Sequence, residues 1–343
     1  MTGAVATEVE AQAARAAALQ NFLVAAGWGH AERRLLAGDA SFRRYDRLTQ
    51  AGRTAVLMDA PPPHEDVRPF LLVRSLLEER GLSAPRLYAA DEAQGFLLLE
   101  DLGDDTYTRL LARGQDETKL YRLAVDALIE LARASDGKAL AALPALDDAR
   151  ALDEAARFLD WWWPTAQGAP VPDPVRADWT AAWRAVLPLG RRVAETIALF
   201  DFHVDNLLWL KGRPGIAACG LLDFQDAVHA PMGFDLMSLL QDARRDLKPG
   251  LEAELYERFL AAFPALDRAA FADAFAVFGA ERHARILGTF VRLWKRDGKP
   301  GYLVHLPRVW RQLETALAAP VMAPLAAWFD RHVPAARRGA LPT

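Results

Sequence analysis

Cysteine is nearly absent from this sequence, and basic side chains are not in excess. A single thiol, Cys219, in 343 residues cannot form an internal disulfide or a cysteine-rich metal site, which is typical of proteins from a reducing compartment. Lys and Arg number 41 against 45 Asp and Glu, so the formal net charge is −4, whereas nucleic-acid binders usually carry a strong basic excess. We therefore expect a cytoplasmic protein with no nucleic-acid partner.

Long apolar runs are missing as well. No stretch reaches the roughly 20 apolar residues that a membrane-spanning helix needs. The first ten residues, MTGAVATEVE, lack the basic start and apolar centre of a signal peptide. We expect no membrane partner, and no pattern indicates an obligate protein partner. The remaining composition, 52% hydrophobic and 25% charged, is that of a globular protein, long enough for two units with separate cores.

The hydrophobic pattern predicts a β-rich N-terminal part and a helical remainder. An alanine-rich amphipathic stretch over 8–26 predicts a helix that ends at Gly27. Short strands are predicted at 34–37, 41–48, 53–58, 86–90 and 95–100, with a helix at 66–80. From residue 105 the pattern is helical except for short apolar runs at 196–200, 207–210 and 216–222. The predicted fold class is α+β, with a small β-rich lobe over 1–102 and a larger, mainly helical lobe over 103–343.

Two segments place polar side chains directly against apolar strands. They read LFDFHVDN over 199–206 and LLDFQD over 221–226. Buried carboxylates are costly unless they have partners or ligands. Phosphoryl transfer needs a carboxylate beside the attacking hydroxyl and oxygen ligands for Mg²⁺. Asp201, Asn206 five residues later and Asp223 after a strand hairpin could supply these parts, and the Asp-x-x-x-x-Asn spacing matches the catalytic loop of protein kinases.

These segments resemble the aminoglycoside-phosphotransferase and choline-kinase group, whose loop usually reads His-Gly-Asp-x-x-x-x-Asn and whose second motif reads Ile-Asp-Phe/Trp. The resemblance implies a two-lobed, protein-kinase-like fold with ATP and Mg²⁺ in the cleft. It makes Asp201 the catalytic carboxylate and Asn206 and Asp223 the Mg²⁺ ligands. In the segment PMGFDL, Asp235 matches an Asp that braces the loop. The departure from the group is Leu199, where its first His normally stands.

A closer resemblance is to bacterial anomeric kinases of cell-wall recycling. It rests on GDASFRRY from 38, MDAPP from 58, LLEDLG from 98, FHVDN from 202 and LDFQDA from 222. The resemblance implies phosphorylation of the C1 hydroxyl of N-acetylmuramate, N-acetylglucosamine or both, in peptidoglycan recycling. Two alternatives stay open. One is a kinase for another small alcohol, such as choline, homoserine or another sugar, and the other is a pseudokinase-like nucleotide-binding module.

The expected nucleotide-binding residues lie in the β-rich lobe. A loop at Gly38, with Ser41, either covers the phosphates or is only a hairpin turn. The strand over 54–59 lacks the Lys that kinases use for the α- and β-phosphates, so Arg43 and Arg44 are the substitutes. Because neighbouring strand residues face opposite sides, only one of them can face the nucleotide. Phe42 shares the face of Arg44 and is expected in the core.

The junction and the acceptor site rest on weaker patterns. Glu100 and Leu102 are expected at the hinge, where backbone groups would bind adenine. Candidate substrate contacts are His203, Asp205, Gln225 and Asp226, with a loop-bracing role equally open for His203 and Asp205.

Two further patterns bear on the acceptor. The run Trp161-Trp162-Trp163 could stack on a sugar, but packing in the larger lobe is favoured because three consecutive side chains point in different directions. The segment 281–299 carries six Lys and Arg against two acidic residues. Such a run is typical of a solvated helix face. The net positive charge of this segment disfavours a polycationic aminoglycoside as the acceptor and favours a carboxylated or neutral sugar.

Overall fold

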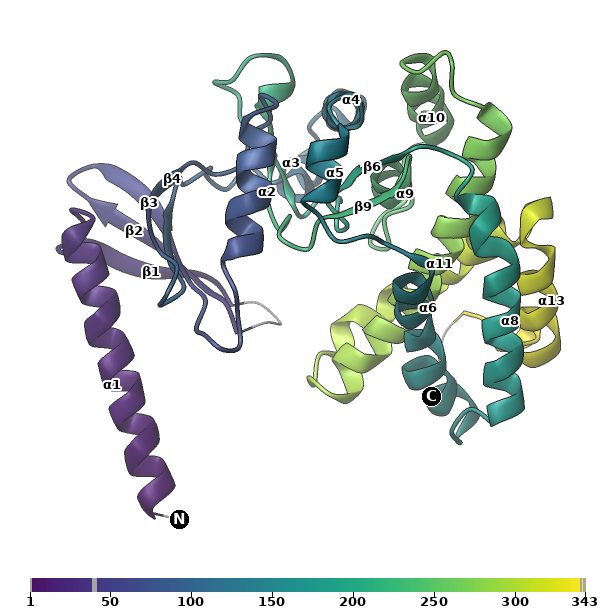
Figure 1. Ribbon diagram of the computed structural model, residues 1–343, viewed down its shortest axis with the longest axis horizontal. Coiled ribbons are helices and arrows are strands. Elements are labelled where there is room, and N and C mark those ends of the chain that lie inside the picture. The colour runs from purple at the N-terminus through teal and green to yellow at the C-terminus, as the bar shows by residue number, and fades with distance from the viewer. Residues whose placement is uncertain (1, 39–41, 340, 342–343) are drawn as a thin grey trace. The chain divides into compact units, whose positions relative to one another are not determined.

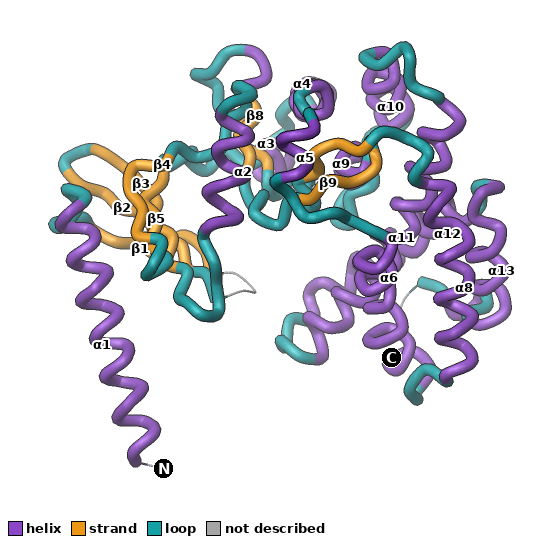
Figure 2. Tube along the Cα trace, viewed as in Figure 1, coloured by secondary structure: helices purple, strands orange, loops and turns teal. Residues whose placement is uncertain are grey.

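The structure is a computed structural model that describes residues 2–38, 42–339 and 341 (Figures 1 and 2). Contacts between residues divide the chain into two compact units. The first comprises Met1–Asp105 and Leu208–Gln225, and the second comprises Thr106–Leu207 and Asp226–Thr343. The first unit therefore includes a segment from the middle of the chain in addition to the N-terminal hundred residues.

The first unit is built on a five-stranded antiparallel sheet in the order β1-β2-β3-β5-β4. Its elements are α1 (Thr2–Ala25), β1 (Glu32–Gly38), β2 (Arg44–Gln50), β3 (Arg53–Asp59), α2 (Arg68–Glu78), β4 (Leu87–Asp91) and β5 (Phe96–Leu99). The C-terminal half of helix α1 packs against one face of this sheet, and its N-terminal half extends beyond the strands (Figure 1). Leu19 and Leu23 of α1 pack there against Leu48, Leu57 and Leu98, which are all at most 1% exposed.

The middle segment of the chain completes the first unit. Strand β7 (Leu207–Trp209) pairs with β8 (Cys219–Leu221), and the short 3₁₀ helix η2 (Gly215–Ala218) lies between them. The amide of Leu221 donates to the carbonyl of Ser83 at 2.8 Å. Phe224, just after β8, stacks on Phe70 of α2 with ring centroids 4.8 Å apart. These contacts attach the hairpin to α2 and to the chain that follows it.

The second unit is helical, with one pair of short strands. Its main elements are α3 (Tyr107–Ala112), α4 (Glu117–Arg133), α5 (Gly137–Ala141), α6 (Asp148–Arg157), α7 (Trp163–Gln167), α8 (Asp173–Gly190), β6 (Glu195–Ala198), β9 (Val228–Pro231), α9 (Phe234–Leu240), α10 (Leu251–Ala261), α11 (Arg268–Lys295), α12 (Leu306–Leu317) and α13 (Ala323–His332). The turn of π-helix η1 (Phe158–Trp162) joins α6 to α7, and 3₁₀ turns lie at Pro300–His305, Pro320–Met322 and Ala335–Arg337. Strands β6 and β9 are antiparallel.

Helix α11 is the centre of the second unit and contacts α6, α8 and α12 (Figure 2). Its Gly288 lies against the start of the π-helix, where a Cβ would be 2.1 Å from the carbonyl oxygen of Arg157. Only glycine allows this approach. Trp162 and Trp163 of the tryptophan run are 1% and 7% exposed, and Trp162 stacks on Phe158 at 4.6 Å. The packing interpretation is therefore confirmed for these two residues.

The predicted α+β class, with its small β-rich part and larger helical part, is confirmed. The predicted order of three strands, a helix and two strands after a leading helix is also found. Strand β9 was not predicted, and the run at 216–222 forms the turn η2 before it forms β8. Within the described ranges, no helix is both long and apolar enough to cross a membrane.

Candidate active site

Asp201 lies in the loop that joins β6 to β7, and its side chain is 44% exposed. Phe202 and Val204, one and three positions after Asp201, are each 2% exposed. These apolar side chains are buried, whereas the side chain of Asp201 is partly exposed. Asn206 Nδ2 donates to the carbonyl oxygen of Asp201 at 3.0 Å, so the two predicted site residues of this loop are directly connected.

Asp235 braces the loop from below, as the resemblance implied. Its Oδ2 accepts the amide of Leu199 at 2.5 Å, and its Oδ1 accepts the amide of Phe200 at 3.1 Å. Gly233 makes this possible because its φ of 98° turns the chain from β9 into α9, and a Cβ there would lie 2.7 Å from the ring of Phe271. Burial raises the pKa of Asp235 to about 7 despite these two hydrogen bonds. The bracing uses the backbone of residue 199, so it does not require the missing histidine.

Phe200 has a left-handed backbone, with φ at 76°. The usual loop pattern of the group that this segment resembles has glycine at this position, and the conformation costs a non-glycine residue roughly 1–2 kcal/mol. The ring of Phe200 is 5% exposed and stacks on Phe234 with centroids 5.6 Å apart. The guanidinium of Arg285 lies 4.0 Å from the centroid of the same ring. Aromatic packing thus stabilises a backbone conformation that glycine would adopt more easily.

Arg282 and Arg285 correct the prediction of a solvated helix face over 281–299. Arg282 is 1% exposed and Arg285 is 5% exposed, because α11 passes through the middle of the second unit. Arg285 Nη2 is 4.0 Å from Asp201 Oδ1, and Arg285 Nη1 is 3.9 Å from Glu154 Oε2. Burial, followed by the charge of Arg285, lowers the pKa of Arg282 to about 10. These cations are part of the surroundings of Asp201.

The protonation of Asp201 depends on these neighbours. Desolvation alone would raise the pKa of its carboxyl, but the positive charge of Arg285 opposes this, with further contributions from Arg282 and Arg244. Their combined effect holds the pKa of Asp201 below its ordinary value. Asp201 is therefore ionised at neutral pH and can accept a hydrogen bond or a proton from a hydroxyl group.

His203 and Asp205 contact other parts of the second unit. His203 is 8% exposed, and its Nε2 is 3.4 Å from Asn206 Nδ2. Burial, followed by the charge of Arg244, lowers the pKa of His203, so its ring is neutral at neutral pH. Asp205 accepts a hydrogen bond from Thr108 Oγ1 and lies 3.2 Å from Arg244 Nε. These contacts describe bracing roles, and substrate contacts of the two residues stay a prediction.

In the first unit, Asp223 follows β8 with φ at 56°, a conformation that Asp tolerates better than most residues. Its Oδ1 accepts a hydrogen bond from Gln225 Nε2 at 2.9 Å. Asp226, the first residue of the second unit after this segment, is exposed. The side chain of Gln225 therefore orients the predicted metal ligand, and contacts of Gln225 or Asp226 with substrate stay predictions.

The predicted hinge follows β5. The amide of Glu100 donates to the carbonyl oxygen of Arg86 at 2.8 Å, and its carboxylate lies 2.5 Å from Arg213 Nη2. The side chain of Glu100 is thus held by an ion pair within the first unit. The segment through Leu102 has no regular secondary structure, and its adenine contacts stay predictions.

The expected phosphate-binding residues differ in their surroundings. Gly38 is the last residue of β1, and Ser41 lies outside the described residues. Arg43 lies 3.5 Å from Glu65, whereas Arg44 is 58% exposed and pairs with Asp46. The expectation that Phe42 faces the core is wrong, since Phe42 is 65% exposed and stacks on His64.

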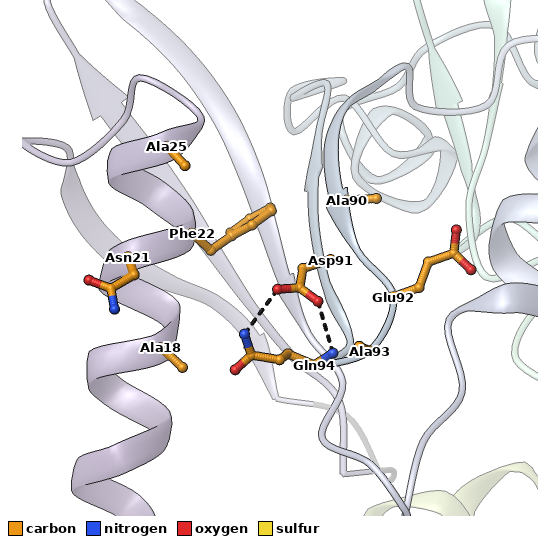
Figure 3. Close-up of a pocket in the computed structure, with 9 residues that line it drawn as sticks. All are labelled: Ala18, Asn21, Phe22, Ala25, Ala90, Asp91, Glu92, Ala93 and Gln94. Carbon is orange, nitrogen blue, oxygen red and sulfur yellow. Dashed lines mark hydrogen bonds between the residues drawn. The ribbon is translucent and has the colours of Figure 1, made fainter.

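A separate hollow lies between α1 and the turn that joins β4 to β5 (Figure 3). It is lined by Ala18, Asn21, Phe22, Ala25, Ala90, Asp91, Glu92, Ala93 and Gln94. The carboxylate of Asp91 already accepts the amide and the side-chain Nε2 of Gln94, at 3.0 and 2.9 Å. None of the predicted site residues lines this hollow, and it plays no part in the site.

Sequence reasoning missed two residues next to Asp201. Arg285 was counted in a charge run, although a cation three positions after Arg282 on a helix shares its face, and apolar neighbours on that face would have indicated burial. Phe200 stands where the usual loop pattern of the resembled group has glycine. An aromatic residue in place of a loop glycine was the available signal.

Comparisons with known proteins show the family of this chain. Residues 32–272 match the model of the phosphotransferase enzyme family. The chain is 40% identical to an N-acetylmuramate/N-acetylglucosamine kinase of Caulobacter vibrioides, with 96% of this chain and 98% of the relative covered. It is 37% identical to a protein of the same name from Pseudomonas aeruginosa, with 88% and 89% covered. The fold is similar to that of a choline/ethanolamine kinase family protein from Mesorhizobium loti, at a TM-score of 0.59 and 13% identity, over 92% of this chain and 98% of that one. The chain therefore belongs to the phosphotransferase enzyme family.

Proposed function

We propose that this protein is an ATP-dependent kinase that phosphorylates the anomeric C1 hydroxyl of N-acetylmuramate, N-acetylglucosamine or both. The names of the relatives, which match nearly the whole chain, support the sugar. The observation that carries the proposal is the ionised, partly exposed Asp201 on a loop that Asp235 braces. A carboxylate held in this way can orient a hydroxyl and accept its proton as the phosphoryl group is transferred.

The environment of Asp201 supports an anomeric hydroxyl. Arg285 and its neighbouring cations keep Asp201 ionised, which also makes it a weak base. An anomeric hydroxyl is more acidic than an ordinary alcohol, so a weak base suffices. In the reaction, the C1 oxygen bonds to the γ-phosphorus, the bond from that phosphorus to the β–γ bridging oxygen breaks, ADP leaves, and Asp201 takes the proton.

The same cations disfavour an aminoglycoside acceptor. Arg244, Arg282 and Arg285 place positive charge around Asp201 in the second unit. A polycationic acceptor would be repelled there, whereas a neutral sugar would not, and a sugar with a carboxylate would be attracted. We therefore place N-acetylmuramate and N-acetylglucosamine ahead of aminoglycosides as substrates.

Asn206 and Asp223 are our proposed Mg²⁺ ligands. Because Asn206 Nδ2 donates to the backbone of Asp201, the side-chain oxygen of Asn206 is the atom suited to a cation. Asp223 adds a carboxylate, and both are the hard oxygen donors that Mg²⁺ prefers. Among the described residues, no group of three His, Cys, Asp or Glu could hold a metal, but Mg²⁺ at nucleotide sites usually has only one or two protein ligands besides phosphates and water. When bound, Mg²⁺ would neutralise charge on the ATP phosphates.

The test is an ATP-consumption assay with both amino sugars, their methyl glycosides, choline, homoserine and kanamycin. We expect turnover of the free amino sugars only, dependent on Mg²⁺ or Mn²⁺ and stopped by EDTA. Phosphorus–proton coupling in NMR should place the phosphate on C1, and Asp201→Asn should reduce kcat by roughly 10²–10⁴. A methyl glycoside that reacts as fast as its free sugar would refute C1 phosphorylation. Preference for choline or homoserine would refute the sugar, and ATP binding without turnover of any acceptor would favour a pseudokinase.

A further inference from the structure

The third strand of the sheet lacks the lysine that kinases use. In protein kinases this strand reads Val-Ala-Ile-Lys, and its Lys binds the α- and β-phosphates of ATP. Here β3 contains Ala55-Val56-Leu57-Met58, so a methionine stands where the lysine would be expected. Met58 is 1% exposed and carries no charge. A phosphate-binding cation of the first unit would therefore have to come from another position.

The register of β2 and β3 assigns the two candidate arginines to opposite faces. Tyr45 pairs with Met58, and Arg44 pairs with Asp59. The face of Arg44 is the face that α1 covers, since Arg15 of α1 bonds to Asp59. Arg44 itself is 58% exposed and donates through Nε to Asp46 Oδ1 at 3.0 Å. It is a surface residue on the side of the sheet opposite Met58.

Arg43 lies on the other face. It immediately precedes β2, so strand alternation places it on the side of Tyr45 and Met58. A residue two positions from Tyr45 is a diagonal neighbour of Met58, within reach of a long side chain at roughly 7–8 Å. An arginine at position 43 is therefore long enough to reach the place that the lysine side chain would occupy.

Glu65 holds Arg43 in position. Its Oε2 is 3.5 Å from Arg43 Nε, and its Oε1 accepts the amide of Phe42 at 3.0 Å. The side chains of Arg43 and Glu65 are only 13% and 16% exposed. Glu65 shortly precedes α2, the helix that follows β3. Protein kinases pair their strand lysine with a glutamate from the helix in this place in the chain.

We infer that Arg43, held by Glu65, binds the phosphates of ATP in place of the strand lysine. A guanidinium has five N–H donors, more than one carboxylate can engage, and it can bind phosphate oxygens in bidentate fashion. Glu65 acts as a positioning residue for Arg43. The inference rests on the proposed kinase function for its ligand, but it concerns the nucleotide and not the sugar.

The experiment compares Arg43→Ala with the matched control Arg44→Ala. Binding of ATP·Mg²⁺ and of adenosine is measured by calorimetry without sugar, and the KM values for ATP and sugar are measured separately. We expect Arg43→Ala to weaken ATP binding and raise the KM for ATP by roughly tenfold or more, the scale of one charge-assisted contact. Adenosine binding and the sugar KM should stay near wild type, and Arg44→Ala should be nearly silent.

Two further variants test the contact between Arg43 and Glu65. Glu65→Gln should raise the KM for ATP less than Arg43→Ala does. Arg43→Lys should bind ATP more tightly than Arg43→Ala because it keeps the positive charge, but less tightly than the wild type because lysine lacks the bidentate geometry. Unchanged ATP binding in Arg43→Ala, or an equal loss of adenosine and ATP binding, would overturn the inference.

The outcomes of these experiments can be separated from the outcomes that test the proposed function. Arg43-dependent ATP binding without sugar turnover refutes only the sugar, whereas sugar turnover that is indifferent to Arg43 refutes only this inference.

Discussion

Two buried carboxyls in the second unit should make the protein less stable as the pH rises from 5 to 8. Burial raises the pKa of Asp235 from 3.8, and that of Glu281 from 4.5, to about 7. Such groups bind more protons in the folded chain than in the unfolded chain between the two pKa values. The free energy of unfolding therefore falls with rising pH, from above about pH 4 until both carboxyls are ionised, above about pH 7.

The size of the effect follows from the two pKa values of each group. A pKa difference of one corresponds to about 1.4 kcal/mol. Complete ionisation should therefore lower the free energy of unfolding by about 4 kcal/mol for Asp235 and about 3 kcal/mol for Glu281. No discount for solvent screening is needed, because Asp235 is 5% exposed and Glu281 is 0% exposed. This is a large part of the stability of an ordinary domain, about 5–15 kcal/mol.

The assay is urea unfolding at several pH values between 5 and 8, followed by tryptophan fluorescence. Eight of the ten tryptophans belong to the second unit, so the signal reports on the part of the chain that contains both carboxyls. Asp235→Asn should remove the contribution of Asp235 to the slope of the unfolding free energy against pH. It should also lower the unfolding free energy by roughly 1–3 kcal/mol at every pH, since the amide can accept a hydrogen bond from only one of the two backbone N–H groups. Glu281→Gln should also flatten the slope.

Asp153→Asn is the matched control, because Asp153 is exposed on α6 next to the buried Glu154. Its pH slope should equal that of the wild type. If wild type and Asp235→Asn gave parallel slopes, Asp235 would be ionised in the folded protein throughout the range. The reasoning that the brace below the Asp201 loop carries the proton would then be refuted.

Two predictions concern the neighbours of Asp201. Arg285→Met should raise the pKa of Asp201 and so move the acidic limb of the kcat/KM profile to higher pH, because the largest opposing positive charge is lost; an unmoved limb would place the control of that pKa elsewhere. Phe200→Gly should relieve roughly 1–2 kcal/mol of left-handed strain but lose a buried ring worth about 3–5 kcal/mol. The variant should thus be less stable by about 1–4 kcal/mol in urea unfolding, and a more stable variant would show that the strain outweighs the packing.

The β-rich unit could be predicted because its signals are local. Turn residues such as Gly52, with φ at 75°, separate strands of alternating pattern, and neighbours in sequence pair in the sheet. The spacing of Asp201 and Asn206 was equally local, and both fall in one loop. Strand β9 was not predicted because its sequence, Val-His-Ala-Pro, is not a continuous apolar run, unlike the segments at 196–200 and 207–210. Its partner β6 lies some 30 positions earlier in the chain, so no local pattern indicates the pairing.

The surroundings of Asp201 could not be predicted in the same way. Helix α11 contains both charged and apolar residues on faces that are buried, because other helices pack around most of it. A charge run on such a helix looks like a solvated face until its neighbours are known. The conformation of Phe200 could not be predicted from local sequence either. Only tertiary packing against Phe234 and Arg285 makes an aromatic side chain compatible with its left-handed backbone.

The division of the first unit between two segments of the chain has a consequence for synthesis on the ribosome. A nascent chain that has emerged through Asp105 can pair β1 to β5, but it lacks the hairpin of β7 and β8. Phe70 then has no Phe224 to cover it, and Ser83 lacks its partner Leu221. About a hundred residues of the second unit must emerge before these contacts can form. The N-terminal segment therefore passes through a stage with exposed apolar surface on α2, a stage at which chaperone binding would protect the chain from aggregation.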